Sequence, residues 1–426
     1  MRDRFRLILV LSATLPACSG GSGAPVAPIN PGSTTSSASP ATPVATPTPM
    51  RTASPAPTAS PVRTASPAPT ASPAPTATPI ADCDVTEFPI PTADSGPYFI
   101  SAGPDGALWF AEQSANKIGR ITTSGSITEF PVPTANSGPT GIAAGPDGAL
   151  WFTEQRANKI GRITTAGSIT EFAIPLPPGV TVGSGMPFGI AAGPDGALWF
   201  AEGTDVDAAN GAIGRITTAG AITEFSVVAS GGSQPLGISA GPDGNLWFAD
   251  SKTVGFGKIG RITTSGTVTE FAVSGTITNP FDIAMGPDGA LWFTVSSIAG
   301  EMGAIGRVTT AGTFTQFATP TTISDPTGIT AGPDGALWFA DSFENLVGRI
   351  STAGTITEFT IPTANGDPLG IVAGPDGALW FTEGFANRIG RIPTCASPAA
   401  LQRSTRNSSA RSRRRFGTGR PSAAPG

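Results

Sequence analysis

Six carboxylates recur at one position of this chain, each directly after a Leu-Trp-Phe segment and one further residue. Val295 occupies the seventh copy of the position, and the acids are Glu112, Glu154, Glu202, Asp250, Asp341 and Glu383. A second set of side chains follows a Pro in each copy and comprises Tyr98, Thr140, Phe188, Leu236, Phe281, Thr327 and Leu369. Mostly apolar side chains beside carboxylates would suit a cation or a cationic, partly apolar ligand. In the alternative, the acids only accept hydrogen bonds from loop amides in every copy.

Imidazole chemistry is absent from this chain because the sequence contains no His. A general base near neutral pH would therefore have to be a carboxylate with a raised pKa. A Ser-His-Asp type of triad lacks its His, and no Gly-rich phosphate loop opens a helix. Asp205 and Asp207, with Asn210, resemble a calcium loop only loosely.

An octet spaces these residues along the chain and is repeated seven times: Gly-Pro-Asp-Gly, a small or polar residue, and Leu-Trp-Phe. Its copies begin at Gly103, Gly145, Gly193, Gly241, Gly286, Gly332 and Gly374. Each unit is one supersecondary block that must stack on its neighbours, so seven units predict an all-β, seven-bladed β-propeller with four-stranded blades. Every Trp of the chain lies in an octet, and we expect these Trp side chains to pack between successive blades.

The first unit predicts strands at 99–102, 108–111, 118–121 and 127–130, with a tight Pro-Asp-Gly turn after the first strand. Counting outward from the turn between the last two strands predicts that Arg120 pairs with Glu129 across the sheet. The same count predicts the pairs Arg162–Glu171, Arg215–Glu224, Arg261–Glu270 and Arg349–Glu358, and it places Arg307 opposite the neutral Gln316.

The fourth, outer strand of the first unit reads Ile-Thr-Glu-Phe, and this outer-strand motif also occurs before the first octet, as Val-Thr-Glu-Phe at residues 85–88. The last unit, in contrast, stops after its third strand at residues 389–392. We therefore expect the N-terminal strand to complete the last blade, with Glu87 opposite Arg391, which removes an exposed sheet edge. Superposing this split pair of strands on the intact third and fourth strands of another unit places Cys83 and Cys395 at adjacent positions of the connecting turn. We therefore predict a disulfide between them. Two unrelated cysteines are the alternative.

The chain begins with the features of an exported bacterial lipoprotein. Residues 1–18 combine three Arg with an apolar run and end on a Leu-Pro-Ala-Cys tetrapeptide that resembles a lipobox, so we expect Cys18 to carry the lipid. An ordinary cleaved signal is the alternative. Residues 19–81 are rich in Pro, Ser, Thr and Ala and predict a disordered stalk, residues 82–395 the propeller, and residues 396–426 an Arg-rich disordered tail. These features place the protein in the cell envelope, at the outer membrane or the cell surface.

Charge and loop length bear on the partners. Residues 82–395 carry 29 Asp and Glu against 13 Lys and Arg, which argues against nucleic acid as a partner of the propeller. The Arg-rich tail is solvated, or else contacts anionic lipid or the acidic ring. Length variation between the units concentrates on one face, where we expect a peptide, glycan or protein ligand to bind. We expect the protein to be a monomer that contacts the membrane only through its lipid. The varied loops lie at 176–186, 203–212, 229–234, 251–257 and 295–303.

Two segments, 127–134 and 151–164, resemble units of the virginiamycin B lyase, or streptogramin lyase, family, and the resemblance extends over about residues 84–393. It implies a seven-bladed propeller that opens a cyclic depsipeptide by β-elimination. It also implies magnesium held by acidic residues, a His that acts as the base, and a second His nearby.

The resemblance retains part of that site and loses the rest. Tyr98 is retained within Gly-Pro-Tyr, and Asp367 and Glu383 match the acidic positions that imply magnesium ligands. The two His positions are occupied by Thr327 and Leu369. We therefore expect a surface-tethered, non-catalytic binding propeller. The alternatives are a streptogramin-lyase-like enzyme that uses Tyr98, Asp367 and Glu383 with magnesium, and an envelope-assembly scaffold.

Overall fold

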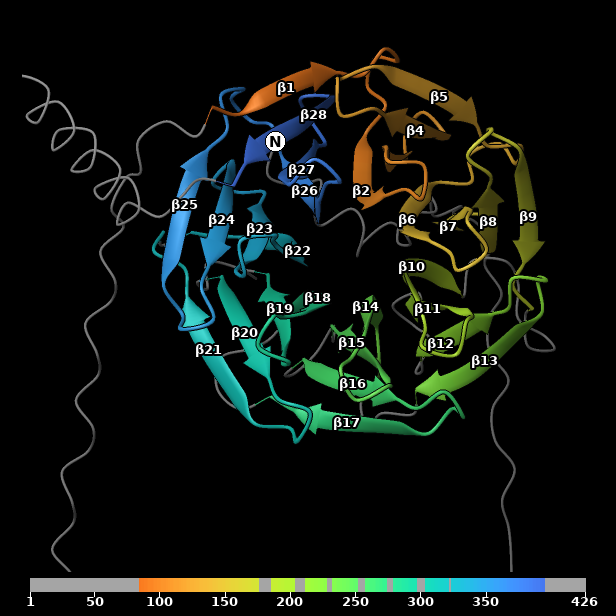
Figure 1. Ribbon diagram of the computed structural model, residues 1–426. Coiled ribbons are helices and arrows are strands. Elements are labelled where there is room, and N and C mark those ends of the chain that lie inside the picture. The colour runs from red at the N-terminus through yellow and green to blue at the C-terminus, as the bar shows by residue number, and fades with distance from the viewer. Residues whose placement is uncertain are drawn as a thin grey trace, which may run out of the picture. The chain divides into compact units, whose positions relative to one another are not determined.

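Seven antiparallel sheets of four strands are arranged around a common centre (Figure 1). The computed structural model describes residues 84–175, 185–203, 211–227, 232–251, 257–273, 279–296, 303–321 and 323–394. The all-β, seven-bladed propeller expected from the repeats is confirmed. In the part of the chain so described, no helix has the length and hydropathy needed to cross a membrane.

Each blade runs from the centre to the rim, and we number the blades 1 to 7 by their innermost strands. These are β2 (Pro97–Ala102), β6 (Pro139–Ala144), β10 (Met186–Ala192), β14 (Pro235–Ala240), β18 (Pro280–Met285), β22 (Pro326–Ala331) and β26 (Pro368–Ala373). The second strands are β3 (Leu108–Glu112), β7 (Leu150–Glu154), β11 (Leu198–Gly203), β15 (Leu246–Asp250), β19 (Leu291–Val295), β23 (Leu337–Asp341) and β27 (Ala378–Glu383). The third strands are β4 (Lys117–Ile121), β8 (Lys159–Ile163), β12 (Gly211–Ile216), β16 (Lys258–Ile262), β20 (Ala304–Val308), β24 (Leu346–Ile350) and β28 (Arg388–Pro393). The outer strands are β5 (Ile127–Pro131), β9 (Ile169–Ala173), β13 (Ile222–Val227), β17 (Val268–Ala272), β21 (Phe314–Ala318), β25 (Ile356–Thr360) and β1 (Thr86–Pro89).

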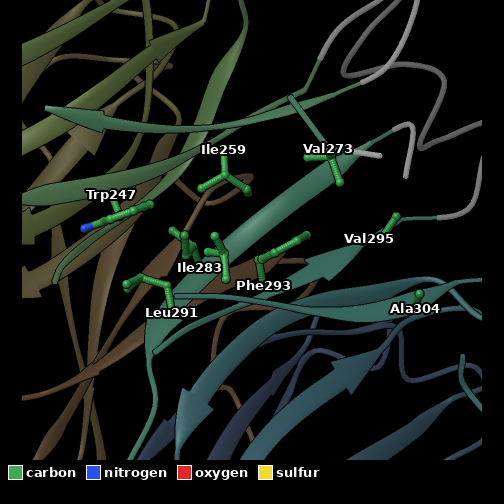
Figure 2. Packing of buried hydrophobic residues seen from close by; sticks show 9 residues of the cluster. Trp247, Ile259, Val273, Ile283, Leu291, Phe293, Val295 and Ala304 are labelled. Carbon is green, nitrogen blue, oxygen red and sulfur yellow. The ribbon is translucent and has the colours of Figure 1, made fainter. Parts of the chain in front are cut away.

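The hydrophobic core lies between neighbouring blades. Trp247 of blade 4 is fully buried and shares one cluster with Ile283 and Phe293 of blade 5 (Figure 2). It also stacks on Phe271, the outer-strand Phe of its own blade, with 5.3 Å between the ring centroids. All seven Trp are buried in this way, so the expectation that they pack between successive blades is confirmed.

The Asp of each octet orients the Trp. In blade 1, Asp105 Oδ1 accepts a hydrogen bond from Trp109 Nε1 at 3.0 Å, and Asp105 Oδ2 accepts one from Arg120 Nε at 2.7 Å. The Arg120 guanidinium also lies over the indole, 5.8 Å from its centroid. Burial alone would raise the pKa of Asp105, but the hydrogen bonds from Trp109 and Arg120 together hold that pKa below its usual value.

The expected Arg–Glu pairs across the third and fourth strands are wrong by one residue. Arg120 stands opposite Thr128, and Glu129 stands opposite Gly119. The connecting turn closes with a hydrogen bond from Thr122 N to Ser126 O, which leaves three residues in the loop and fixes this register. A shift of one residue moves a side chain to the other face of the sheet. Arg162, Arg215, Arg261, Arg307 and Arg349 likewise stand opposite Thr170, Thr223, Thr269, Thr315 and Thr357, so Arg307 does not face Gln316.

The N-terminal strand completes the last blade, because blade 7 has the strand order β1-β28-β27-β26. Phe88 of β1 stacks on Trp380 with 5.6 Å between ring centroids, as the outer-strand Phe does within blade 1. The expected closure is confirmed, but the Glu87–Arg391 pair is wrong, since Arg391 stands opposite Thr86. Glu87 instead accepts a hydrogen bond from Thr363 N at 2.9 Å.

Several expectations concern residues outside the described ranges. They include Cys18, the Cys83–Cys395 disulfide, the stalk and the Arg-rich tail. All of these stay predictions.

Candidate functional site

The side chains that follow each crossover Pro gather at the centre of the ring. The register of β2 against β3 shifts between Pro97 and Ile100, so Tyr98 lies in a β-bulge. The innermost strand of every other blade shows the same shift. A bulge bends its strand and redirects the side chains at that point.

These side chains pack against one another. Tyr98 and Phe188 make an edge-to-face contact with 5.7 Å between centroids, and Phe188 makes another with Phe281 at 5.6 Å. The buried cluster contains Tyr98, Phe188, Leu236 and Leu369, with Phe99 and Phe281 packed against it, and Thr140 and Thr327 are buried as well. The structure therefore brings most of the predicted binding side chains together and buries them. Their contact with a ligand stays a prediction.

The six acids at the ends of the second strands are buried too. Asp250 Oδ1 accepts a hydrogen bond from Gln234 N at 2.6 Å, and Asp341 Oδ1 accepts one from Asp325 N at 3.0 Å. In these two blades the acids accept hydrogen bonds from loop amides, which is the alternative that the sequence left open. Contact of these six carboxylates with a ligand stays a prediction.

Glu112, Glu154 and Glu383 differ from those two acids, because no backbone amide donates a hydrogen bond to their carboxyl oxygens. Burial is the main cause that raises their pKa values, to about 8 for Glu112, about 7 for Glu154 and about 8 for Glu383. The outer-strand Glu beside each one adds to the effect. These three carboxyl groups therefore retain their protons into the neutral range.

The Tyr98 hydroxyl is a buried polar group without a hydrogen-bond partner. Burial, and then the carboxylates of Asp367, Asp325 and Asp282, raise the pKa of this hydroxyl far above its usual range. Tyr98 belongs to blade 1, whereas the acids come from blade 5 and from the crossovers into blades 6 and 7. The acids that raise this pKa therefore come from parts of the chain that lie far apart in the sequence.

Asp367 lies at the end of the crossover before β26. Its backbone oxygen accepts a hydrogen bond from Gly384 N at 2.9 Å, which joins the crossover to the β27–β28 loop. Burial, and then Asp325, raise the pKa of the Asp367 carboxyl to about 7. Glu383 ends β27, directly before that loop. Tyr98, Asp367 and Glu383 are therefore all placed at this side of the ring by blades 1 and 7.

Magnesium is the ion that the resemblance implies. Within the described ranges, no group of three or more His, Cys, Asp or Glu side chains could hold a metal ion. At one implied His position, the Thr327 hydroxyl donates to the carbonyl oxygens of Leu369 and Pro368, at 3.0 and 3.1 Å. At the other, Leu369 belongs to the apolar cluster. Magnesium at Asp367 and Glu383 stays a prediction, and we assign no reaction step to it.

Asp282 on β18 is a further carboxylate that the sequence reasoning missed. Its Oδ1 accepts a hydrogen bond from Ile283 N at 2.9 Å, and its Oδ2 accepts one from Ile329 N of blade 6 at 3.0 Å. Burial raises the pKa of Asp282 to about 7 against the effect of these two bonds. A signal was present in the repeats, because five blades carry Gly at this position, namely Gly141, Gly189, Gly237, Gly328 and Gly370.

The calcium-like segment with Asp205, Asp207 and Asn210, and most of the varied loops, fall outside the described residues. A role for them in binding stays a prediction.

Comparisons with known proteins agree with this fold. A family model described as the virginiamycin B lyase family matches residues 78–231 and 206–409. A solved structure described as streptogramin B lyase is 37% identical, with a TM-score of 0.64, and the match covers 72% of this chain and 97% of that one.

A second solved structure is that of a catalytically inactive histidine-to-alanine variant of virginiamycin B lyase from Staphylococcus aureus with quinupristin. It is 36% identical, with a TM-score of 0.64, and the match covers 73% of this chain and 99% of that one. A virginiamycin B lyase from Bacillus licheniformis is 46% identical over 43 residues, a segment that spans 10% of this chain and 15% of that relative.

Proposed function

Because the chain belongs to the virginiamycin B lyase family, we propose that it retains the family's propeller as a ligand-binding scaffold without catalysing the family's elimination. The ligand is a peptide, glycan or protein bound at the loop face. The propeller is tethered to the cell envelope as a lipoprotein. The segment before the propeller, with its lipobox-like tetrapeptide and Pro-rich stalk, supports the tether.

One observation carries the non-catalytic assignment: both positions that the resemblance assigns to His are occupied by side chains with structural contacts. Thr327 is 1% exposed, and its hydroxyl donates to backbone carbonyl oxygens. Leu369 packs against Tyr98, Phe188 and Leu236. Neither side chain can exchange a proton with a substrate near neutral pH.

A streptogramin-lyase-like enzyme is the second candidate, and it is favoured by the retention of Tyr98, Asp367 and Glu383. In that case a carboxylate would have to abstract the proton. Asp367, with its pKa raised to about 7, has the proton affinity that such a base requires.

Quinupristin distinguishes the two candidates. The protein is incubated with it, with magnesium or with a chelator, and chromatography with mass spectrometry separates the intact ring from its ring-opened isomer. We expect no opening by the natural chain. Magnesium-dependent opening that disappears with Glu383→Gln would establish the enzyme and overturn the proposal. A double variant with Thr327→His and Leu369→His tests in parallel whether imidazole is the missing component.

The tether has its own test. We expect the full-length chain to fractionate with membranes and Cys18→Ser to move it to the soluble fraction, because the lipid is attached through that thiol. Cys83→Ser serves as the matched control and should stay membrane-bound. Equal fractionation of the Cys18→Ser and natural chains would contradict the lipoprotein assignment.

A further inference from the structure

In three blades a Lys side chain lies between two acids on one face of the sheet. Lys159 of β8 stands directly opposite Glu154, and its Nζ donates a hydrogen bond to Glu171 Oε2 at 3.0 Å. The same ammonium donates to Thr134 Oγ1 at 2.6 Å. Blades 1 and 4 repeat the contact, with 3.2 and 2.8 Å between Nζ and Oε2 in the pairs Lys117–Glu129 and Lys258–Glu270. The fold therefore forms a place for a primary ammonium group between these acids.

Blade 3 keeps both acids and lacks the cation. Ala212 of β12 stands opposite Glu202, and Glu224 stands opposite Gly214, two residues further along β12. Side chains opposite each other in an antiparallel pair, and side chains two apart along a strand, point to the same face, so the two acids flank the position of the missing ammonium as they do in blade 2. The adjoining segments 176–184 and 204–210 contain no Lys or Arg that could replace it.

In the two other blades without a cation at this position, its loss is accompanied by a second change. In blade 5 both acids are replaced as well, by the neutral Val295 and Gln316. In blade 6 the buried Leu346 fills the position, and Asp341 Oδ1 accepts hydrogen bonds from two loop amides at 3.0 and 3.2 Å. Within the ranges that the structure describes, blade 3 alone keeps both acids without either change.

The Glu202 carboxyl group also lacks a hydroxyl partner that other blades provide. In blade 4, Ser233 Oγ donates to Asp250 Oδ2 at 2.9 Å, whereas Gly185 holds the place of that Ser in blade 3, where an added Cβ would lie 3.0 Å from Glu202 Oε2. Glu202 is 4% exposed, and none of the described amide, hydroxyl or cationic groups donates a hydrogen bond to its Oε1. A buried carboxyl oxygen left without a donor costs free energy, which points to a donor supplied by a ligand.

The position between the two acids is open to solvent. Glu224 is exposed, whereas its counterparts Glu129 and Glu171 are half-buried beside their Lys side chains. Ala212 is half-buried and lacks everything that a Lys side chain carries beyond Cβ. A ligand can therefore reach both acids from outside the blade.

An ammonium group suits this pair of acids better than a metal ion does. Calcium takes about six to eight oxygen ligands, and among the described residues no third acidic side chain joins these two to build such a shell. An ammonium needs acceptors only for its N–H groups, and in blade 2 one Glu and one Thr accept two of them.

We propose that Glu202 and Glu224 of blade 3 bind a primary ammonium group on an aliphatic stem, in the position that a Lys side chain fills in blades 1, 2 and 4. The two carboxylates accept its N–H groups, and the stem lies against Ala212. This site is separate from the ring centre and is therefore additional to the proposed function, whichever of its two candidates holds.

The probe is n-propylammonium, because it corresponds to the part of a Lys side chain that Ala212 lacks. Saturation-transfer NMR with the full chain should detect its binding with a Kd of about 1–10 mM, as expected for so small a ligand. The neutral 1-propanol should bind at least about tenfold more weakly, because it brings no charged hydrogen bond. Equal binding of the two compounds, or no binding of n-propylammonium at about 50 mM, overturns the inference.

Variants assign the binding to blade 3. Ala212→Lys supplies the ammonium from within the chain and should abolish binding of n-propylammonium. Glu224→Gln should weaken that binding about tenfold, and because Glu224 is exposed it provides a second variant if Ala212→Lys fails to fold. Asp94→Asn is the matched control, because Asp94 is exposed on a crossover and Asn occupies the equivalent left-handed position at Asn136. Unchanged binding in folded Ala212→Lys or Glu224→Gln protein, or an equal loss in the control, overturns the assignment.

The source of the ammonium group is distinguished with acetyl-Gly-Lys-Gly-amide. Binding at least as tight as that of n-propylammonium identifies the Lys side chain of a peptide or protein, whereas binding of n-propylammonium alone identifies a small free amine. Calcium chloride that displaces n-propylammonium at an equal or lower concentration would assign the two acids to a metal ion and overturn the inference.

Discussion

The repeated blades allow single residues to be compared in nearly the same surroundings, because one position can differ between two blades while its neighbours are the same. In blade 2, Glu171 Oε2 accepts hydrogen bonds from Lys159 Nζ at 3.0 Å and from Thr134 Oγ1 at 2.6 Å. Burial opposes these bonds, which nevertheless hold the pKa of Glu171 below its usual value. In blade 3, Ala212 replaces the Lys, while Glu202 and Glu224 both remain. Burial, and then Glu224, raise the pKa of Glu202, and burial raises that of Glu224.

Replacing the same outer-strand Glu in these two blades should therefore have opposite effects. We expect Glu171→Gln to lower the free energy of unfolding by about 1–2 kcal/mol at pH 7, because it removes charged hydrogen bonds. Glu224→Gln should leave the stability unchanged or increase it by up to about 1 kcal/mol, because it relieves repulsion within the carboxyl pair. Denaturant unfolding of both variants gives the comparison, and losses of equal size would show that the missing Lys is not the cause.

At the level of elements, closure of the ring depends on a strand that enters the last blade from the far end of the chain. Ile90, directly after β1, shares a cluster with Phe110 of blade 1 and Trp380 of blade 7. The first strand therefore covers the edge of β28 and also contributes to the seam between the first and last blades. An uncovered edge there would expose unpaired backbone groups and the indole.

Phe88 of the closing strand should contribute as much to stability as Phe130, its counterpart in blade 1. Phe88 on Trp380 and Phe130 on Trp109 have the same geometry, with ring centroids 5.6 Å apart and planes inclined by 16°. Both Phe88→Ala and Phe130→Ala should lower the melting temperature, each costing about 2–4 kcal/mol as partly buried aromatic truncations. A Phe88→Ala protein as stable as the natural chain, beside a destabilised Phe130→Ala protein, would show that the ring does not depend on its closing strand.

For the whole molecule, two families of carboxyl groups shift their pKa values in opposite directions. The octet Asp groups are held below their usual value, as at Asp105, so their contribution to stability is lost as the pH falls through their folded pKa. The buried Glu groups are raised, as at Glu112, so their contribution is present below the usual Glu pKa of 4.5 and is lost as the pH rises through about 8. Stability should consequently be highest in mildly acidic solution.

Melting temperatures across pH test this dependence. We expect a fall between pH 5 and pH 9, because unfolding frees Glu112, Glu154 and Glu383 to ionise. Replacing these three residues by Gln should flatten the alkaline side of the profile, since an amide does not titrate. The profile of the natural chain is the control, and an unchanged slope in the triple variant would place the dependence elsewhere.

The repeat pattern was sufficient for the fold because blade architecture is local in the sequence. The octet fixed the turn and the buried Trp, and the outer-strand motif before the first octet already indicated how the ring closes. The Arg–Glu register could not be counted reliably, because one residue in a turn decides which face a side chain takes. Arg120 therefore pairs with Asp105 beside Trp109. Glu129 forms an ion pair with Lys117 instead, with 3.2 Å between Oε2 and Nζ.

The candidate site was only partly accessible from the sequence, because it is formed by residues from several blades. The resemblance points to Tyr98 and Asp367, whereas the one sequence signal for Asp282 is that it replaces the Gly of five other blades. The number of blades, their strands and the way the ring closes can be read from the repeats, because each depends on spacing within or between adjacent units. Which side chains meet at the centre, and which of them are buried there, follows from the folded ring, because its centre brings together strands from distant parts of the chain.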